Sequence, residues 1–216
     1  MKINNVFLQI LLLVSFSSLA QDIPSEFSSK YIPNKKGGEV IYCGNDKHFL
    51  VKFNGKKVEH TEIEGGTNPL NQHFIAVDGK VIQSSIIPIP QNVLDSYDLN
   101  NLSLEQQESI LTGYMNYELE YIAKEMELGI TEIRMKAETH GSKSYIFWRY
   151  NIGNYKDSED PKVELAKGQI YLSIMCFNQI LTLNMPFLKD YSLNDLTKAL
   201  TKIVKTLEIK NISCTQ

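Results

Sequence analysis

The chain has 216 residues, of which 43% are hydrophobic and 22% are charged, the proportions of an ordinary globular protein. Its formal net charge of −3 gives no general attraction to phosphate backbones or to anionic lipid. The composition therefore predicts that nucleic acid is not a partner.

Residues 1–20 have the pattern of a secretory signal peptide. Lys2 provides a positive start, residues 6–14 form an apolar core, and Ala20 precedes Gln21 at the expected cleavage site. The apolar run is too short to cross a bilayer, so we expect no membrane span in the mature chain. An ordinary N-terminal apolar helix is the alternative, which Pro24 disfavours because proline stops helix continuation. We therefore expect a periplasmic or secreted protein, cleaved between Ala20 and Gln21.

The rest of the chain reads as a short lead-in followed by one domain. Serine, proline and glycine are frequent in residues 21–38, which we expect to be loosely ordered. Residues 39–216 are long enough for one well-packed core and too short for two. We expect them to form a single domain.

The first half of this domain is rich in strand patterns. Asn54-Gly55 stands between the extended runs 48–53 and 56–63, and Asp78-Gly79 stands between two further runs. Both dipeptides tolerate the positive φ angles of a two-residue turn. The sequence therefore predicts two β-hairpins in an antiparallel meander.

A long helix follows. Ser103 with Gln106 forms a capping-box pattern, and leucine, isoleucine and methionine then recur at helical spacing. This pattern predicts a helix over about residues 104–128, with an apolar stripe toward a sheet. The polar side is expected to carry Glu108, Glu118, Lys124 and Glu125.

The C-terminal half returns to strands and ends in a second helix. Within the strand 144–152, Ile146 and Trp148 share one face, while Tyr145 and Phe147 lie on the other. After Ser192 as N-cap, an apolar stripe predicts the terminal helix. The fold class is therefore α+β, an antiparallel sheet of about seven strands with helices packed on it. The stripe consists of Leu193, Leu196, Leu200, Ile203, Val204 and Leu207.

Three cysteines remain after the leader. Cys176 lies on the apolar face of its strand, which makes it a small core residue. Cys43 and Cys214 lie outside such a face, so a Cys43–Cys214 disulfide is predicted for an oxidising compartment. Three free thiols remain the alternative, because sequence alone does not bring the two chain segments within bonding distance.

The order of elements over about residues 74–210 is distinctive: strand, long helix, antiparallel strands, terminal helix. Within it stand Ser144-Tyr145-Ile146-Phe147, Gly168-Gln169-Ile170-Tyr171 and Ile180-Leu181-Thr182-Leu183-Asn184. This arrangement resembles the PsbP-like fold family, which includes photosystem II extrinsic subunits, the Ran-binding nuclear-import factor and bacterial secreted proteins. The resemblance implies a three-layer α/β/α sandwich and, since most members are accessory or binding proteins, a non-enzymatic role. It carries over no functional residue.

No motif predicts catalysis or a metal site. The histidines His48, His60, His73 and His140 show no metal-ligand spacing. His60 with Glu62 could share a strand face, but solvated polar positions are the default interpretation. No Gly-x-Ser-x-Gly nucleophile elbow occurs. We therefore expect no catalytic residue, no metal and no cofactor.

The aromatic strand 144–152 provides the one candidate for binding. If Tyr145, Phe147 and Arg149 line an open cleft, they could hold a small amphipathic ligand or a protein partner. The alternative, which we favour for the two rings, is that helices cover them as core. The predicted function is a non-enzymatic accessory or binding protein outside the cytoplasm. The alternative is an extracytoplasmic hydrolase whose catalytic residues are dispersed in sequence.

Overall fold

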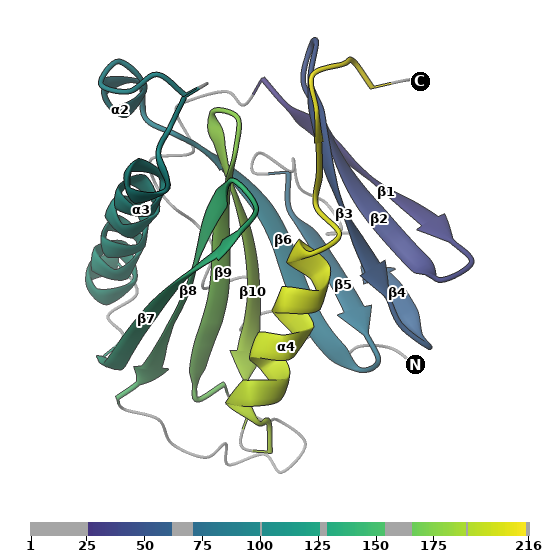
Figure 1. The fold of residues 1–216 in the computed structure, drawn as a ribbon. Coiled ribbons are helices and arrows are strands. Elements are labelled where there is room, and N and C mark those ends of the chain that lie inside the picture. The colour runs from purple at the N-terminus through teal and green to yellow at the C-terminus, as the bar shows by residue number, and fades with distance from the viewer. Residues whose placement is uncertain are drawn as a thin grey trace.

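The computed structural model describes residues 26–61, 71–99, 101–125, 129–153, 166–188 and 190–214. The predicted signal peptide, residues 1–20, lies outside these ranges. Within them the chain forms two antiparallel sheets and three helices (Figure 1). None of the helices in this part of the chain has the length and apolar character needed to span a membrane.

The larger sheet has seven strands, and every neighbouring pair is antiparallel. This confirms the predicted α+β class and sheet size. The Asp78-Gly79 hairpin is also confirmed, because both residues have positive φ angles, 50° and 85°. In spatial order the strands are β4 (Val58–Thr61), β5 (His73–Val77), β6 (Lys80–Pro88), β10 (Gln179–Phe187), β9 (Gly168–Cys176), β8 (Lys143–Ile152) and β7 (Ile130–His140).

A second sheet of four strands corrects the expectation of a loosely ordered lead-in. Residues 28–38 form strand β1 and the start of β2. Pro33 fits because β1 is an edge strand, where a missing N–H leaves no partner unpaired. The order of this sheet is β1 (Ser28–Asn34), β2 (Gly37–Cys43), β3 (His48–Asn54) and β11 (Glu208–Lys210).

The predicted hairpin at Asn54-Gly55 is wrong. Strand β3 belongs to the four-stranded sheet and β4 to the seven-stranded sheet, so these residues carry the chain from one sheet to the other. The Gly55 N–H donates to the carbonyl of Lys36 at 3.1 Å, and the Lys57 N–H donates to Asp78 Oδ1 at 2.9 Å. Partners distant in sequence therefore hold the crossing in place.

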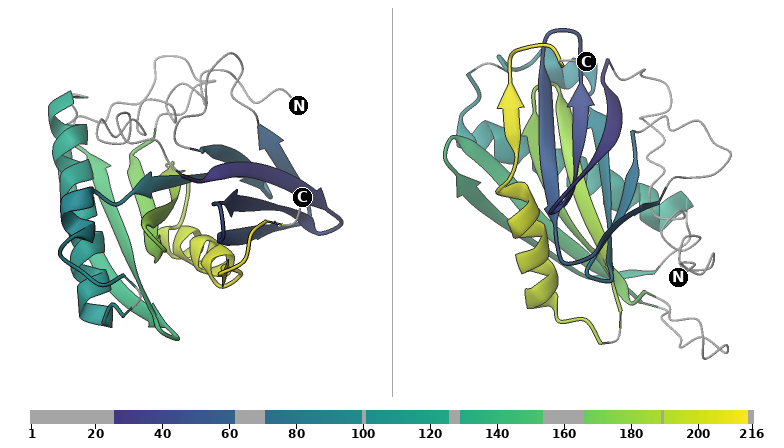
Figure 2. Two further views of the ribbon diagram at one scale, coloured as in Figure 1. Left: turned by 90° about the horizontal axis from the view of Figure 1, so that it is seen from above. Right: turned by 90° about the vertical axis from the view of Figure 1, so that its right-hand side faces the viewer.

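The two faces of the seven-stranded sheet are covered by different elements. Helix α3 (Leu104–Glu125) packs on one face, while α4 (Leu193–Val204) and the four-stranded sheet share the other (Figures 1 and 2). A third helix, α2 (Gln91–Leu94), is short. The expected capping box is present, since the Ser103 N–H donates to Gln106 Oε1 and the Gln106 N–H donates to Ser103 Oγ. The predicted three-layer α/β/α arrangement did not include the four-stranded sheet, which the structure places beside α4.

The two faces of β8 enter two separate cores. Ile146 and Trp148 pack toward α3, whereas Tyr145 and Phe147 face α4 and the four-stranded sheet, as the alternation predicts. Cys176 is fully buried in the second of these cores. Burial in apolar surroundings raises the pKa of its thiol to about 12, so it is chemically inert at neutral pH.

Cys43 and Cys214 form a disulfide, the pairing that the sequence favoured. Their Cα atoms are 5.7 Å apart across a sequence separation of 171 residues. The bridge joins the end of β2 to the segment after β11, and Ser213 Oγ donates to the carbonyl of Asn45 nearby at 2.9 Å. The C-terminal segment is therefore fastened to the four-stranded sheet.

Candidate functional site

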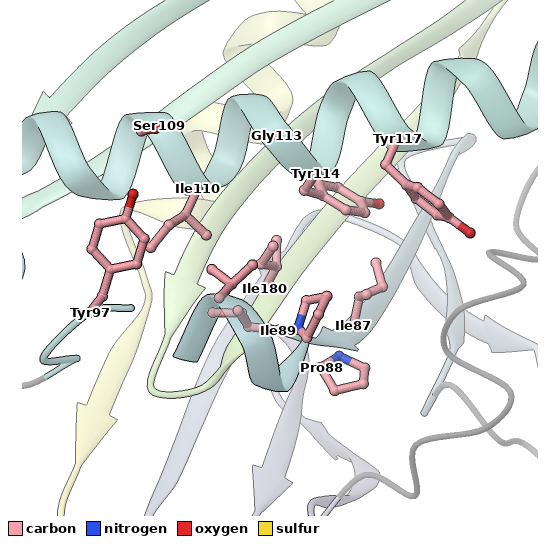
Figure 3. Close-up of a pocket in the computed structure, with 12 residues that line it drawn as sticks. Ile87, Pro88, Ile89, Tyr97, Ser109, Ile110, Gly113, Tyr114, Tyr117 and Ile180 are labelled. Carbon is pink, nitrogen blue, oxygen red and sulfur yellow. The ribbon is translucent and has the colours of Figure 1, made fainter. Parts of the chain in front are cut away.

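A mainly apolar cavity opens between α3 and the end of β6. It has a volume of about 340 Å³. One wall is α3, and the other is formed by Ile87, Ile89 and Ile180 together with α2 (Figure 3). The rings of three tyrosines, Tyr97, Tyr114 and Tyr117, and the side chain of Ser109 also line this mainly apolar surface. We call this cavity the tyrosine pocket.

Local sequence explains why the chain leaves a cavity here. Pro88 ends β6 and Pro90 precedes α2, because neither proline can donate to a ladder. The Ile89 N–H donates to the carbonyl of Asn178 at 3.0 Å, which holds this bend against the β9–β10 turn. The chain therefore turns away from the sheet beside α3 and leaves space between the two.

Gly113 forms part of the α3 wall. Glycine in a helix interior costs about 1 kcal/mol relative to alanine, so it is not there for helix stability. A Cβ atom built at Gly113 meets no atom within 4 Å. The missing side chain therefore widens the tyrosine pocket.

Behind this pocket lies a buried group of polar side chains between α3 and the sheet. Glu118 is only 3% exposed and is one helical turn beyond Tyr114 on α3. Glu118 Oε2 and Thr182 Oγ1 have no hydrogen-bond partner in the structure, and the hydroxyls of Tyr150 and Tyr171 lie beside each other without a well-formed hydrogen bond. We call these four side chains the Glu118 cluster.

The Glu118 carboxyl is electrostatically unusual. Burial raises its pKa from an ordinary 4.5 to about 8. None of the ion pairs in the described part of the chain involves it. Burial likewise raises the pKa values of Tyr114, Tyr150 and Tyr171, and the nearby Glu118 carboxyl contributes to each rise. The cluster is therefore uncharged at neutral pH.

Tyr114 separates the tyrosine pocket from the Glu118 cluster. Its ring lines the pocket, and its hydroxyl lies beside Thr182 without satisfying Thr182 Oγ1. The ring also meets Trp148 edge-on, with centroids 6.4 Å apart. Trp148 in turn stacks on Tyr171 at 3.8 Å and donates from Nε1 to Ser173 Oγ. The only tryptophan of the chain thus contacts both sides of this partition.

The residues that the sequence singled out for binding lie on the opposite face of the sheet. The rings of Tyr145 and Phe147 are buried, 4% and 6% exposed, in the core under α4. Phe147 and Arg149 border a shallow groove of about 190 Å³, and the Tyr145 hydroxyl donates to Glu138 at 3.0 Å. Ligand binding by Tyr145, Phe147 and Arg149 stays a prediction.

Two of the histidines meet where the sheets approach each other. His60 and His73 share a hydrogen bond of 3.1 Å, and His73 Nε2 bonds Ser29 Oγ of β1 at 2.7 Å. Burial lowers the pKa of His73 to about 4, with a smaller contribution from His60, so His73 is neutral at neutral pH. This chain of contacts links β4 and β5 to β1 and is structural. Glu62, the suggested neighbour of His60, lies outside the described residues.

No metal centre is indicated in the part of the chain that the structure describes. Within these ranges, no group of three or more histidine, cysteine, aspartate or glutamate residues is placed to hold a metal ion. His48 Nδ1 is hydrogen-bonded to the carbonyl of Ile212 at 2.8 Å, and His140 ends β7 at a tight turn. His48 and His140 therefore have structural positions, one in a hydrogen bond to the C-terminal segment and the other at the end of a strand.

Sequence reasoning placed Glu118 on the solvent side of its helix, and that placement is wrong. Glu118 follows Leu111 by seven residues and Met115 by three, and it precedes Ile122 by four. All three spacings put it on the apolar stripe. A carboxyl within an apolar stripe was the signal that would have identified this site.

The sequence matches no protein-family model and no curated protein. The structure is similar to the solution structure of cyanobacterial PsbP (CyanoP) from Synechocystis sp. PCC 6803, with a TM-score of 0.45 and 10% sequence identity. The similarity covers 85% of this chain and 93% of that one.

Proposed function

We propose that this protein is an extracytoplasmic binding protein that holds a small amphipathic ligand in the tyrosine pocket. The observation that carries the proposal is the lining itself. Isoleucine and proline side chains bury an apolar body, while the hydroxyls of Tyr97 and Tyr117 can meet polar groups of the ligand. A volume of about 340 Å³ lies within the range of small-molecule sites.

The same lining favours binding over hydrolysis. Ser109 is the only aliphatic hydroxyl among the described residues of the pocket wall, and no histidine, lysine or carboxylate stands with it there. A serine nucleophile needs a base within hydrogen-bonding distance. A hydrolase would therefore have to use another part of the molecule, which makes it the weaker alternative.

Export is supported by the leader pattern of residues 1–20 and by the Cys43–Cys214 disulfide. We expect protein recovered from outside the cytoplasm to begin at Gln21 and to contain one disulfide. Intact mass under native and reducing conditions measures both features, since reduction adds two hydrogens. A recovered chain that retains Met1 would contradict the proposed export.

Filling the tyrosine pocket should abolish binding without harming the fold. The variant Gly113→Phe places a ring where a Cβ meets no neighbour, and it removes a glycine from a helix interior. With decanol as a neutral amphipathic probe, we expect the affinity to fall at least about tenfold, because the ring occupies the probe's volume. Titration calorimetry and Trp148 fluorescence measure binding, and thermal melting should stay unchanged or rise.

The matched control is Glu120→Phe. Glu120 is exposed on the same helix, about 10 Å further along the axis, and does not line the pocket. This variant should bind decanol as the unmodified protein does. Absence of decanol binding by the unmodified protein, or equal binding by Gly113→Phe, would refute the proposed function.

A further inference from the structure

The Glu118 cluster has no structural explanation of its own. A buried carboxyl that only stabilises a fold is normally paired with a cation or fully hydrogen-bonded. Here Glu118 Oε2 and Thr182 Oγ1 remain without partners behind the pocket wall, and the neighbouring hydroxyls of Tyr150 and Tyr171 have no well-formed hydrogen bond. Each unsatisfied polar group in such a place is destabilising. Their concentration at one point indicates that something else satisfies them.

The hydrogen-bonding properties of the cluster indicate which ligand group would complement it. A carboxylate accepts hydrogen bonds, and hydroxyl oxygens accept them as well. A primary ammonium carries three donors and one positive charge, and it is the complement to a carboxylate surrounded by hydroxyls. The faces of Tyr114 and Tyr171 would add cation–π attraction to such a group.

The cluster is within reach of a ligand in the tyrosine pocket. Tyr114 and Glu118 are four residues apart on α3, which corresponds to about 6 Å along the helix axis and to the same side of the helix. Tyr114 lines the pocket and also interacts with Glu118 and Thr182. A shift of this side chain would bring a ligand in the pocket to the Glu118 carboxyl.

We propose that Glu118 recognises a primary ammonium head group, so that the pocket's ligand class is an apolar chain or ring bearing an amine. This inference rests on the proposed binding function and specifies its ligand. The apolar body lies against Ile87, Ile89 and Ile180, while the ammonium donates to Glu118 Oε2, Thr182 Oγ1 and the Tyr171 hydroxyl.

Binding of an ammonium changes the protonation of Glu118. In the free protein the carboxyl is protonated at neutral pH, because burial raises its pKa to about 8. When the ammonium arrives, the carboxyl proton leaves to solvent and a carboxylate–ammonium pair remains. The titratable groups that interact with Glu118 are Tyr114 from α3, Tyr150 from β8 and Tyr171 from β9, and Thr182 from β10 lies beside Tyr114; none is charged at this pH. Amine binding should therefore tighten as pH rises toward about 8.

Three probes of equal chain length test the inference: decylamine, decanol and decanoate. We expect the unmodified protein to bind decylamine at least about tenfold more tightly than decanol, with decanoate weakest. Glu118→Gln keeps the shape of the side chain and removes its ability to ionise. It should bind decanol unchanged, lose the preference for decylamine, and show no rise in amine affinity between about pH 6 and pH 8. The matched control, Glu120→Gln, changes an exposed carboxyl on the same helix and should behave like the unmodified protein.

A second variant keeps the inference testable if Glu118→Gln does not fold. Tyr171→Phe removes one acceptor oxygen and retains the ring that stacks on Trp148. It should weaken decylamine binding and leave decanol binding unchanged. If no probe binds, or if Gly113→Phe binds decanol normally, the proposed function itself fails. If decanol binds and decylamine is not preferred, or if Glu118→Gln retains the preference, the ammonium assignment is overturned and the binding function stands.

Discussion

Replacing Leu200 with aspartate is expected to unfold the protein. Leu200 is fully buried on the stripe of α4, which packs against β3, β9 and β10 between the two sheets. Aspartate there would be a charge without a partner in an apolar core, a change that costs more than about 4 kcal/mol. Solubility and circular dichroism measure the result. The milder variant Leu200→Ala should fold and lose about 2–5 kcal/mol in urea unfolding.

The control for this prediction lies two residues earlier on the same helix. Lys198 is exposed, and in Lys198→Asp the attraction to Lys202, four residues later, offsets the repulsion from Asp195, three residues earlier. Its stability should remain within about 0.5 kcal/mol of the unmodified protein. Near-native melting of Leu200→Asp would mean that α4 does not seal the core between the sheets.

Removing the Cys43–Cys214 disulfide is expected to cause the second-largest loss of stability. The bridge closes 171 residues of chain, for which chain-entropy models give about 5 kcal/mol. The double variant Cys43→Ser with Cys214→Ser should therefore melt roughly 10–20 °C lower, given the usual unfolding entropy of a domain of this size. Differential scanning calorimetry provides the measurement.

Reductant provides the internal control for this result. Dithiothreitol should lower the melting temperature of the unmodified protein toward that of the double variant, and it should leave the double variant unchanged. Peptide mapping without reduction should show Cys176 as a free thiol. A bridge that contains Cys176, or a double variant that melts like the unmodified protein, would contradict the assigned pairing.

Features that depend on neighbours along the chain could be predicted from the sequence. The α4 stripe, the alternation of β8, the capping box at Ser103 and the turn at Asp78-Gly79 all follow from local geometry. The period of a helix or strand determines which side chains share a face, whatever the rest of the chain does. The assignment of Cys176 to the core and of Cys43 to Cys214 followed from the same parity.

The distribution of the strands between the two sheets could not be predicted from the sequence. Asn54-Gly55 has the composition of a hairpin turn, yet β3 and β4 separate because each pairs with a strand elsewhere in the chain. Residues 28–38 have few apolar side chains and become a strand because β2 offers them a hydrogen-bonding edge. Such pairing depends on contacts between distant residues, which composition and periodicity do not encode.

The candidate site depends on the tertiary structure. The tyrosine pocket exists because the chain bends away at Pro88 and Pro90 while Gly113 leaves α3 without a side chain opposite. The position of Glu118 on the apolar side of α3 could be predicted from its spacing. The buried polar cluster around it could not, because Tyr150, Tyr171 and Thr182 come from three different strands. Most elements and their buried faces follow from the sequence, because backbone geometry repeats locally. The site required the structure, because a cavity and the polar groups around it arise only where distant segments meet.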